Sequence, residues 1–184
     1  MKTLHQERQT RHGESNNGPS EKMAMHKTQN DLPQETRQKM CQLLNARLAD
    51  CTDLSTQVKT AHWNVKGPQF IALHKLFDEI YEDVAEHADA IAERCMQLGG
   101  SALGTARLAA HNSKLDEYPI DIFTCEDHVR EVSKRLAQFG QLARQAIDQA
   151  DEAQDRDTAD LFTEISREMD QWLWFVEAHQ QADR

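Results

Sequence analysis

The fold is decided by residues 70–98, which read FIALHKLFDEIYEDVAEHADAIAERCMQL. Apolar residues recur along this stretch at steps of three or four positions. Such spacing puts them on one face of an α-helix, so the stretch is predicted to be a long helix with one buried stripe. The pair Gly99-Gly100 is expected to end this helix. The positions of the stripe are Phe70, Leu73, Phe77, Ile80, Val84, Ala88, Ile91, Cys95 and Leu98.

Three further stretches show the same helical period. The first begins after Pro33 and ends at Gly67-Pro68, the second begins with a capping-box pattern at residues 124–127, and the third begins within residues 155–160. Residues 99–124 form a long connection between the second and third of the four predicted helices. Four long helices with one long crossover are typical of a ferritin-like four-helix bundle, so we predict an all-α protein of that fold.

The composition excludes several other classes of protein. The chain has 184 residues with only 7 Gly and 4 Pro, too few turn residues for a sandwich or barrel of many short strands. The longest apolar run, residues 172–176, is far too short to cross a bilayer. The residues after Met1 lack the apolar segment of a signal peptide. We therefore expect a soluble, cytoplasmic protein.

The charge is unevenly divided along the chain. The 31 acidic and 21 basic residues give a net charge of -10, which argues against a surface built for nucleic acid and fits a protein that handles cations. Residues 1–31 are polar, lack an apolar period and carry five basic and four acidic residues, so they are predicted to form a flexible tail. Residues 32–184 form the predicted bundle domain and carry a net charge of -11.

The four cysteines are widely spaced and form no C-x-x-C pair. Cys41, Cys51 and Cys95 fall on the apolar stripes, and Cys125 lies in the capping-box pattern. A disulfide framework is the alternative for a small secreted domain, but this chain is long and shows no secretion signal. Buried free thiols are therefore expected.

The residues best suited to chemistry lie on the helix predicted for residues 70–98. His74 and Asp78 are four residues apart, as are Asp89 and Glu93, so each pair shares one face of the helix. At about 100° per residue, all four point to the same side. Each pair alone is equally consistent with a solvated helix face. Together, imidazole and carboxylate ligands suit iron, manganese or zinc.

These four residues cannot bind one metal ion within a single chain. Asp78 and Asp89 are 11 residues apart, which is about 16 Å along a helix. A second copy, antiparallel to the first across a two-fold axis near residues 83–84, would bring the first pair of one chain opposite the second pair of the other. His62, near the end of the preceding helix, could add a further ligand.

Five short motifs stand out in the chain, namely HWNVKGPQFIALH (residues 62–74), DAIAER (89–94), QLGG (97–100), YPID (118–121) and WLWF (172–175). Together they resemble the signature of the Dps family, the mini-ferritins named for DNA protection during starvation. The resemblance covers about residues 35–180. Its most specific part is the combination H-W-N…H-x-x-x-D…D-x-x-x-E.

This resemblance implies a ferritin-like bundle assembled into a hollow shell of twelve subunits. Members of the family oxidise ferrous iron, preferentially with hydrogen peroxide, store the ferric product inside the shell and protect DNA from oxidative damage. Carried over residue by residue, the resemblance implies ferroxidase centres, each for two iron ions, between subunits. Their ligands would be His62, His74 and Asp78 of one subunit with Asp89 and Glu93 of its two-fold mate.

Two further observations bear on this implied centre. Trp63 adjoins His62 and could quench stray oxidising equivalents, and an aromatic wedge at the dimer contact is an equally good interpretation. The sequence contains no E-x-x-H motif. The di-iron centre that larger ferritins hold within one subunit therefore has no obvious ligands here.

A small acidic group surrounds the predicted start of the third long helix. It consists of Asp121, Glu126, Asp127 and Glu131. By analogy with the threefold pores of the family, it could line an entry channel and concentrate cations. The alternative is helix capping and a favourable interaction with the helix dipole.

DNA binding is expected to be weak near neutral pH. Binding to phosphates needs several cations in one patch, whereas residues 1–31 have a net charge of only +1 and residues 180–184 contain no basic cluster. The rival function is a nucleoid-associated protein that compacts DNA and binds metal secondarily. A helical scaffold with vestigial ligands is the structural alternative. The sequence leaves open the oxidant and the metal that is bound in the cell.

Overall fold

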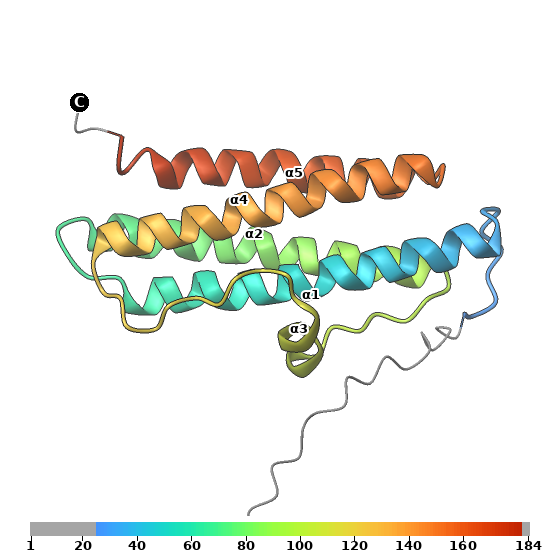
Figure 1. Cartoon of the computed structure of the whole chain (residues 1–184), viewed down its shortest axis with the longest axis horizontal. Helices are drawn as coiled ribbons and strands as arrows, with labels where there is room; N and C mark the ends of the chain where they lie inside the picture. The colour runs from blue at the N-terminus through green and yellow to red at the C-terminus, as the bar shows by residue number, and fades with distance from the viewer. Residues whose placement is uncertain (1–24, 182–184) are drawn as a thin grey trace, which may run out of the picture.

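The computed structural model of this protein describes residues 25–181. Four long helices run side by side, and a short fifth helix lies outside them against α1 (Figure 1). The helices are α1 (Gln34–Asn64), α2 (Phe70–Gln97), α3 (Ala106–Asn112), α4 (Cys125–Glu152) and α5 (Arg156–Glu177). This arrangement confirms the predicted four-helix bundle with a long crossover between its second and third long helices.

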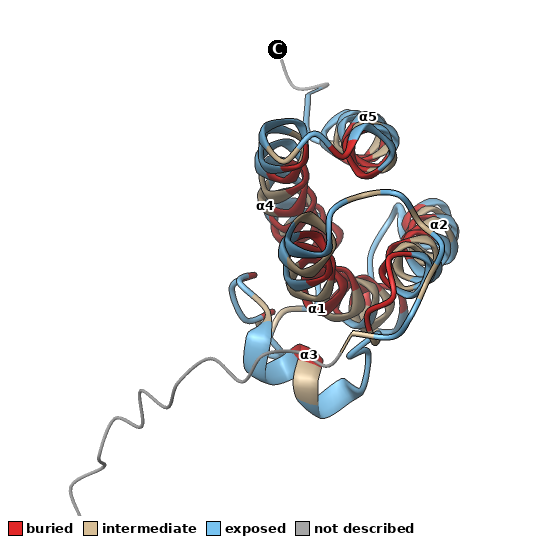
Figure 2. Ribbon diagram, turned by 90° about the vertical axis from the view of Figure 1, so that its right-hand side faces the viewer, coloured by how far each residue is buried: buried red, intermediate tan, exposed pale blue. Residues whose placement is uncertain are grey.

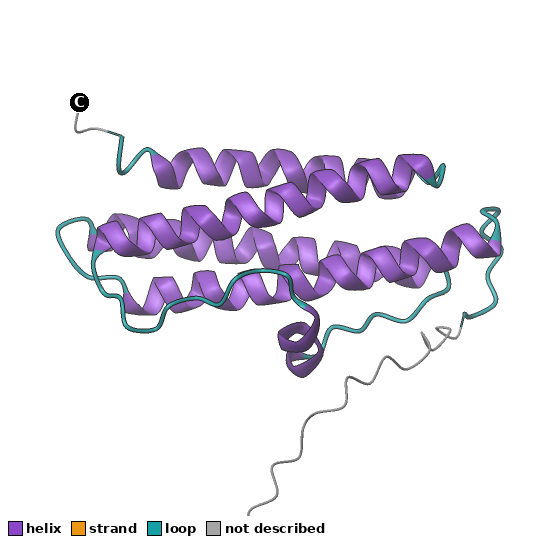
Figure 3. Cartoon of the chain, viewed as in Figure 1, coloured by secondary structure: helices purple, strands orange, loops and turns teal. Residues whose placement is uncertain are grey.

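Loops join the helices, and the described residues form no β-strand (Figure 3). One isolated bridge pairs Lys66 with Thr124. In this bridge the Lys66 amide donates to the carbonyl oxygen of Phe123 at 2.9 Å, and the Cys125 amide donates to that of Lys66 at 3.0 Å. The turn between α1 and α2 is therefore fixed to the start of α4.

Most helix boundaries follow the predicted signals. Pro33 caps α1, and Gly99, which has a φ of +83°, follows α2. The Thr124 hydroxyl accepts a hydrogen bond from the Asp127 amide at 3.1 Å, as expected for the residue that caps α4. Asp155 caps α5 in the same way.

Within residues 25–181, no helix has the length and apolar character needed to cross a membrane.

The crossover differs from the expected plain connection because it contains α3. This helix has only seven residues, too few for an apolar period to reveal it. It buries Ala109 where it packs against α1. Beyond it, the buried Asp50 of α1 accepts hydrogen bonds from the Lys114 amide at 2.6 Å and from Arg47 at 2.8 Å. These contacts hold the crossover against the bundle.

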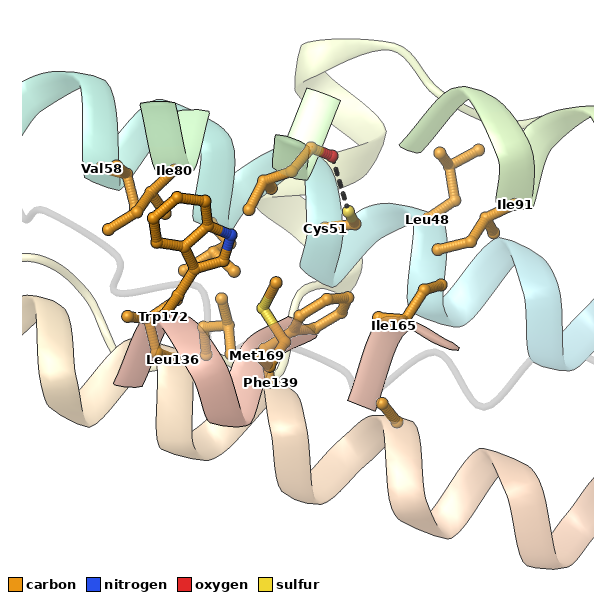
Figure 4. Packing of buried hydrophobic residues seen from close by; sticks show 14 of the residues in the cluster. Leu48, Cys51, Val58, Ile80, Ile91, Leu136, Phe139, Ile165, Met169 and Trp172 are labelled. Carbon is orange, nitrogen blue, oxygen red and sulfur yellow. Dashed lines mark hydrogen bonds between the residues drawn. The ribbon is translucent and has the colours of Figure 1, made fainter. Parts of the chain in front are cut away.

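Buried residues line the inward faces of the four long helices, as the end-on view shows (Figure 2). Phe77, Phe139 and Phe162 are among the largest side chains that are fully buried. In the centre of this core, the Cys51 thiol donates to the backbone oxygen of Val84 at 3.2 Å (Figure 4). All four cysteines are buried and free, which confirms the expectation of unpaired thiols.

The predicted tail lies mostly outside the described residues. In the part that is described, the His26 amide donates to the carbonyl oxygen of Gly99 at 2.7 Å. Arg37 adds hydrogen bonds to the carbonyl oxygens of Leu32 at 3.1 Å and Leu98 at 3.0 Å. The contacts with the end of α2 therefore begin before residue 32, where the sequence placed the start of the bundle domain.

Candidate metal centre

His62 and His74 face each other where α1 ends and α2 begins. The chain reverses direction between them, and Gly67, with a φ of +131°, occupies a conformation that favours glycine. The two imidazole rings are stacked, with their centroids 3.7 Å apart and an angle of 21° between the ring planes. His62 is almost fully buried and His74 is half-buried.

Both rings are held in one orientation by the backbone. Nδ1 of His62 donates to the carbonyl oxygen of His74 at 2.6 Å, and Nδ1 of His74 donates to the carbonyl oxygen of His62 at 2.8 Å. A carbonyl oxygen only accepts, so Nδ1 carries the proton in each ring. The unprotonated Nε2 of each neutral ring is then the nitrogen that can bind a metal ion.

Asp78 lies one helical turn beyond His74, with Oδ1 3.9 Å from Nδ1 of His62. The ammonium of Lys59 forms an ion pair with the same carboxylate oxygen. The hydrogen bond that Lys59 donates to Asp78, together with the nearby imidazoles, lowers the pKa of the Asp78 carboxyl, although partial desolvation opposes the shift. The Lys59 ammonium also lies 4.5 Å from the centroid of the Tyr81 ring. A metal ion binding Asp78 would therefore meet a lysine already paired with its ligand.

Asp89 and Glu93 are exposed and lie farther along α2 than this cluster. Eleven residues of continuous helix separate Asp78 from Asp89, which corresponds to about 16 Å. Within residues 25–181 of one chain, no group of three His, Cys, Asp or Glu side chains is arranged to hold a metal ion. The five-ligand centre between two subunits therefore stays a prediction.

Apolar side chains are exposed beside the histidines. Trp63 is 67% exposed, Ile71 60% and Phe70 42%, and the Phe70 ring centroid lies 5.1 Å from that of His74. In the single chain, Trp63 is therefore mostly exposed. Both predicted roles of Trp63, electron donor and dimer contact, stay predictions.

The acidic group at the start of α4 is only partly free. Asp121 and Glu126 are exposed, and Glu126 lines a cavity of about 720 Å³ together with Lys66 and His179. Asp127 instead pairs with Arg130 at 2.6 Å. The Thr124 hydroxyl, followed by Arg130, lowers the pKa of this carboxyl.

Glu131 has the least free side chain of the four. It is buried and lies 2.8 Å from Lys134, 3.3 Å from Arg130 and 3.4 Å from Arg135. Burial raises the pKa of the Glu131 carboxyl, but these three cations outweigh burial and lower it overall. In the single chain, Asp127 and Glu131 are thus neutralised locally, as in the alternative that assigns the group to helix stability. The entry pore stays a prediction.

Sequence reasoning missed Lys59 as a residue of the centre. Its position three residues before His62 puts both on one face of α1, so the spacing held a signal. The contact with Asp78 crosses from α1 to α2, however, and depends on how the two helices are aligned. Helical periodicity does not fix that alignment.

Comparison with known proteins bears directly on this arrangement. Residues 41–184 match the model of the ferritin-like domain family. The DNA protection during starvation protein of Agrobacterium fabrum is 46% identical over 159 residues, covering 86% of this chain and 98% of that protein. The solved structure of DpsA14 from Streptomyces coelicolor matches with a TM-score of 0.83 and 31% identity, covering 88% of this chain and 96% of its own.

A more distant structure shares the same fold. The Dps protein of Vibrio cholerae O1 matches with a TM-score of 0.79 over 86% of this chain and 99% of its own, at 23% identity. The family match covers most of the chain, and the Agrobacterium relative is covered almost from end to end. The chain therefore belongs to the ferritin-like family and, within it, to the Dps group.

Proposed function

We propose that this protein is a ferroxidase and iron-storage protein of the Dps type. It oxidises ferrous iron, preferentially with hydrogen peroxide, at centres that two chains form across a two-fold axis. It stores the ferric product inside a shell of twelve subunits and so protects DNA from oxidative damage. Iron is the substrate and the cargo in this proposal.

The observation that carries the proposal is the pair of imidazoles at the junction of α1 and α2. The two rings are stacked, and each has its Nδ1 on a backbone carbonyl oxygen, which leaves Nε2 as the nitrogen for a metal ion; the Asp78 carboxylate lies 3.9 Å from Nδ1 of His62. Metal-binding histidines commonly donate the other ring nitrogen to a carbonyl or a carboxylate in this way.

The chemistry follows from the ligands of the proposed centre. Asp78 of one chain with Asp89 and Glu93 of its mate would offset the charge of two ferrous ions, and hard oxygen donors favour the ferric product. His62 and His74 would hold the two ions in position. Hydrogen peroxide takes one electron from each of two ferrous ions and yields two ferric ions and two hydroxide ions. Because both electrons are taken together, little hydroxyl radical is released.

The relatives support this assignment by what they are named for. The Agrobacterium protein is named for DNA protection during starvation, and the Vibrio protein is described as a member of a superfamily of ferritin-like diiron-carboxylate proteins. These descriptions fit a protein in which iron oxidation serves to protect DNA.

The test is oxidation of ferrous iron by hydrogen peroxide, with iron-free protein mixed anaerobically with Fe²⁺. The double variant His62→Ala/His74→Ala is expected to lose at least about tenfold in rate, since even indirect partners of a metal ligand cost about 10–100-fold. His111→Ala, which changes an exposed histidine of α3, is the matched control and should retain the rate. A double variant as fast as the control would overturn the proposal.

Assembly is tested separately by light scattering. The proposed shell predicts a particle of about twelve times the 21.1 kDa chain mass. A stable monomer that still oxidises iron would contradict the centre between subunits. The rival function, DNA compaction, predicts tight complexes in a gel shift at pH 7 and about 150 mM salt, where weak phosphate contacts are screened. We expect no such complexes.

A further inference from the structure

Two cysteines meet at the end of the bundle opposite His62 and His74. Cys41 lies near the start of α1 and Cys95 near the end of α2, and both are fully buried. A Cβ atom added to Gly100 would lie 2.5 Å from Sγ of Cys41 and 2.8 Å from Sγ of Cys95. Both sulfurs thus press against the same backbone position, which only glycine can occupy.

Each sulfur also lies 3.6 Å from a backbone oxygen, that of Cys95 for Cys41 and that of Ser101 for Cys95. The Cys95 side chain, the Gly100 backbone and the charges of Arg37 and Arg94 lower the pKa of the Cys41 thiol although burial opposes the shift. Cys41 is therefore the better nucleophile, because the thiolate is the reactive form of cysteine.

We propose that Cys41 and Cys95 are a dithiol that a peroxide oxidises to an intramolecular disulfide. The Cys41 thiolate attacks one oxygen of hydrogen peroxide, the O–O bond breaks, and hydroxide leaves as Cys41 becomes a sulfenic acid. The Cys95 thiol then attacks the Cys41 sulfur, an S–S bond forms, and the sulfenic oxygen leaves as water. In sum, two thiols and one hydrogen peroxide give one disulfide and two waters. This reaction does not rest on the metal centre.

Access to the sulfurs requires only a local opening. Residues 98–101 lie beside them. The amides of residues 98–100 bond back to α2 at 2.9–3.2 Å, the Cys95 thiol donates to the Ser101 carbonyl oxygen at 3.6 Å, and three further hydrogen bonds come from other segments. The donors are the His26 amide to Gly99 at 2.7 Å, Arg37 to Leu98 at 3.0 Å and Asn45 to Ser101 at 3.0 Å. The last turn of a helix and the loop that follows it open more often than the whole helix unfolds. The bundle therefore stays folded while the dithiol is exposed.

The other two cysteines provide internal controls. The thiol of Cys51 donates to the Val84 carbonyl oxygen at 3.2 Å in the middle of the core, and burial raises its pKa. The thiol of Cys125 donates to the Lys66 carbonyl oxygen at 3.3 Å. Neither has another cysteine among the contacts of the described residues. Neither should react with peroxide as the pair does.

The experiment treats iron-free, full-length protein with hydrogen peroxide, then blocks the free thiols under denaturing conditions and maps peptides by mass spectrometry. The expected result is the loss of two of the four thiols and one disulfide that joins the peptides containing Cys41 and Cys95. Cys125→Ser, the matched control, should behave like the unaltered chain. Retention of all four thiols, or a different pairing, would overturn the proposal.

Variants of the pair separate its two steps. Cys95→Ala should form no disulfide and should leave a sulfenic acid on Cys41 that dimedone traps, whereas Cys41→Ala should show neither product. Gly99→Ala, whose added Cβ atom would lie 2.7 Å from the His26 carbonyl oxygen, loosens the same segment without removing a charge near Cys41 and should speed disulfide formation severalfold. An equal rate in Gly99→Ala and the unaltered chain would refute the opening step, and dimedone labelling of Cys95 would refute the assigned order.

Discussion

Nδ1 of His62 and Nδ1 of His74 each donate to the backbone carbonyl oxygen of the other residue, at 2.6 Å and 2.8 Å. Because both acceptors belong to the backbone, the orientation of each ring depends on the turn between α1 and α2 and not on a neighbouring side chain. The bridge between Lys66 and Thr124 fixes that turn to α4. The bundle thus prepares the two imidazoles for a ligand before any partner chain contributes.

Lys59 is expected to compete with a metal ion for Asp78. Lys59→Met keeps most of the aliphatic stem but removes the charge, so Fe²⁺ should bind more tightly. Ion pairs near the surface are weak, so the gain in affinity should be modest, about 5-fold at most. Anaerobic titration calorimetry measures the affinity for Fe²⁺. Lys75→Met, at an exposed position of α2, is the control. Weaker binding in Lys59→Met would show that the lysine assists the metal.

Arg94 is predicted to hold α5 onto the end of α2. It donates to Asp155 at 2.7 Å and to the Thr158 hydroxyl at 3.0 Å, and the Asp155 side chain is only 1% exposed. Arg94→Met would leave this carboxylate buried without its cation. The free energy of unfolding should fall by about 3 kcal/mol, the lower end for a broken buried pair, because Thr158 still donates to Asp155.

Urea unfolding at one fixed protein concentration measures that loss, since the stability of an oligomer depends on concentration. The control is Asp157→Asn, which removes a pair of 3.7 Å between Arg94 and a highly exposed carboxylate. It should change the free energy of unfolding by less than about 0.5 kcal/mol. Equal losses in the two variants would refute the role given to Asp155.

His128 should make the protein less stable in mild acid. Burial lowers the pKa of this imidazole below its ordinary 6.5, and its Nδ1 lies 2.8 Å from the Tyr118 hydroxyl. Below that ordinary value, the unfolded chain takes up a proton that the folded chain resists. The free energy of unfolding must therefore fall as the pH decreases through this range, with no contribution from His128 at higher pH.

His128→Gln is expected to flatten that pH dependence. Urea unfolding measured at a series of pH values from neutrality to mild acid gives the slope for each protein. His111→Gln, which replaces an exposed histidine of α3, should keep the slope of the unaltered chain. If the free energy of unfolding of His128→Gln falls with decreasing pH as steeply as that of His111→Gln, the His128 imidazole is not the group responsible.

The sequence predicts the long helices well because each is an unbroken apolar stripe bounded by a strong local signal. Pro33 before α1, Thr124 before α4 and the Gly99-Gly100 pair after α2 all act through the backbone of their immediate neighbours. Helix α3 escapes the same reasoning. Two turns are too short for a period, and its contact with α1 depends on the path of the crossover.

The candidate centre is predicted less completely than the fold. The i,i+4 spacing brings His74 and Asp78 to one face of α2, but the pairing of Asp78 with Lys59 depends on the alignment of two helices. Asp89 and Glu93 depend on a second chain altogether. The neutralisation of Glu131 by cations three and four residues ahead, in contrast, was visible in the sequence as an i,i+3 and i,i+4 pattern.

Gly99 is predicted to control how residues 25–32 pack on the bundle. Its φ is +83°, and an added Cβ atom would lie 2.7 Å from the carbonyl oxygen of His26. Gly99→Ala should therefore lower the free energy of unfolding by about 1–2 kcal/mol, the cost of a left-handed conformation for a residue with a side chain. It should also detach the segment, and trypsin should then cleave faster after Lys27.

Gly104→Ala is the matched control, because its Cβ atom would make only an ordinary contact of 3.5 Å with Leu48. This control should be neutral or up to about 1 kcal/mol more stable. Unchanged cleavage after Lys27 in Gly99→Ala would mean that the segment is held by contacts other than the one to Gly99.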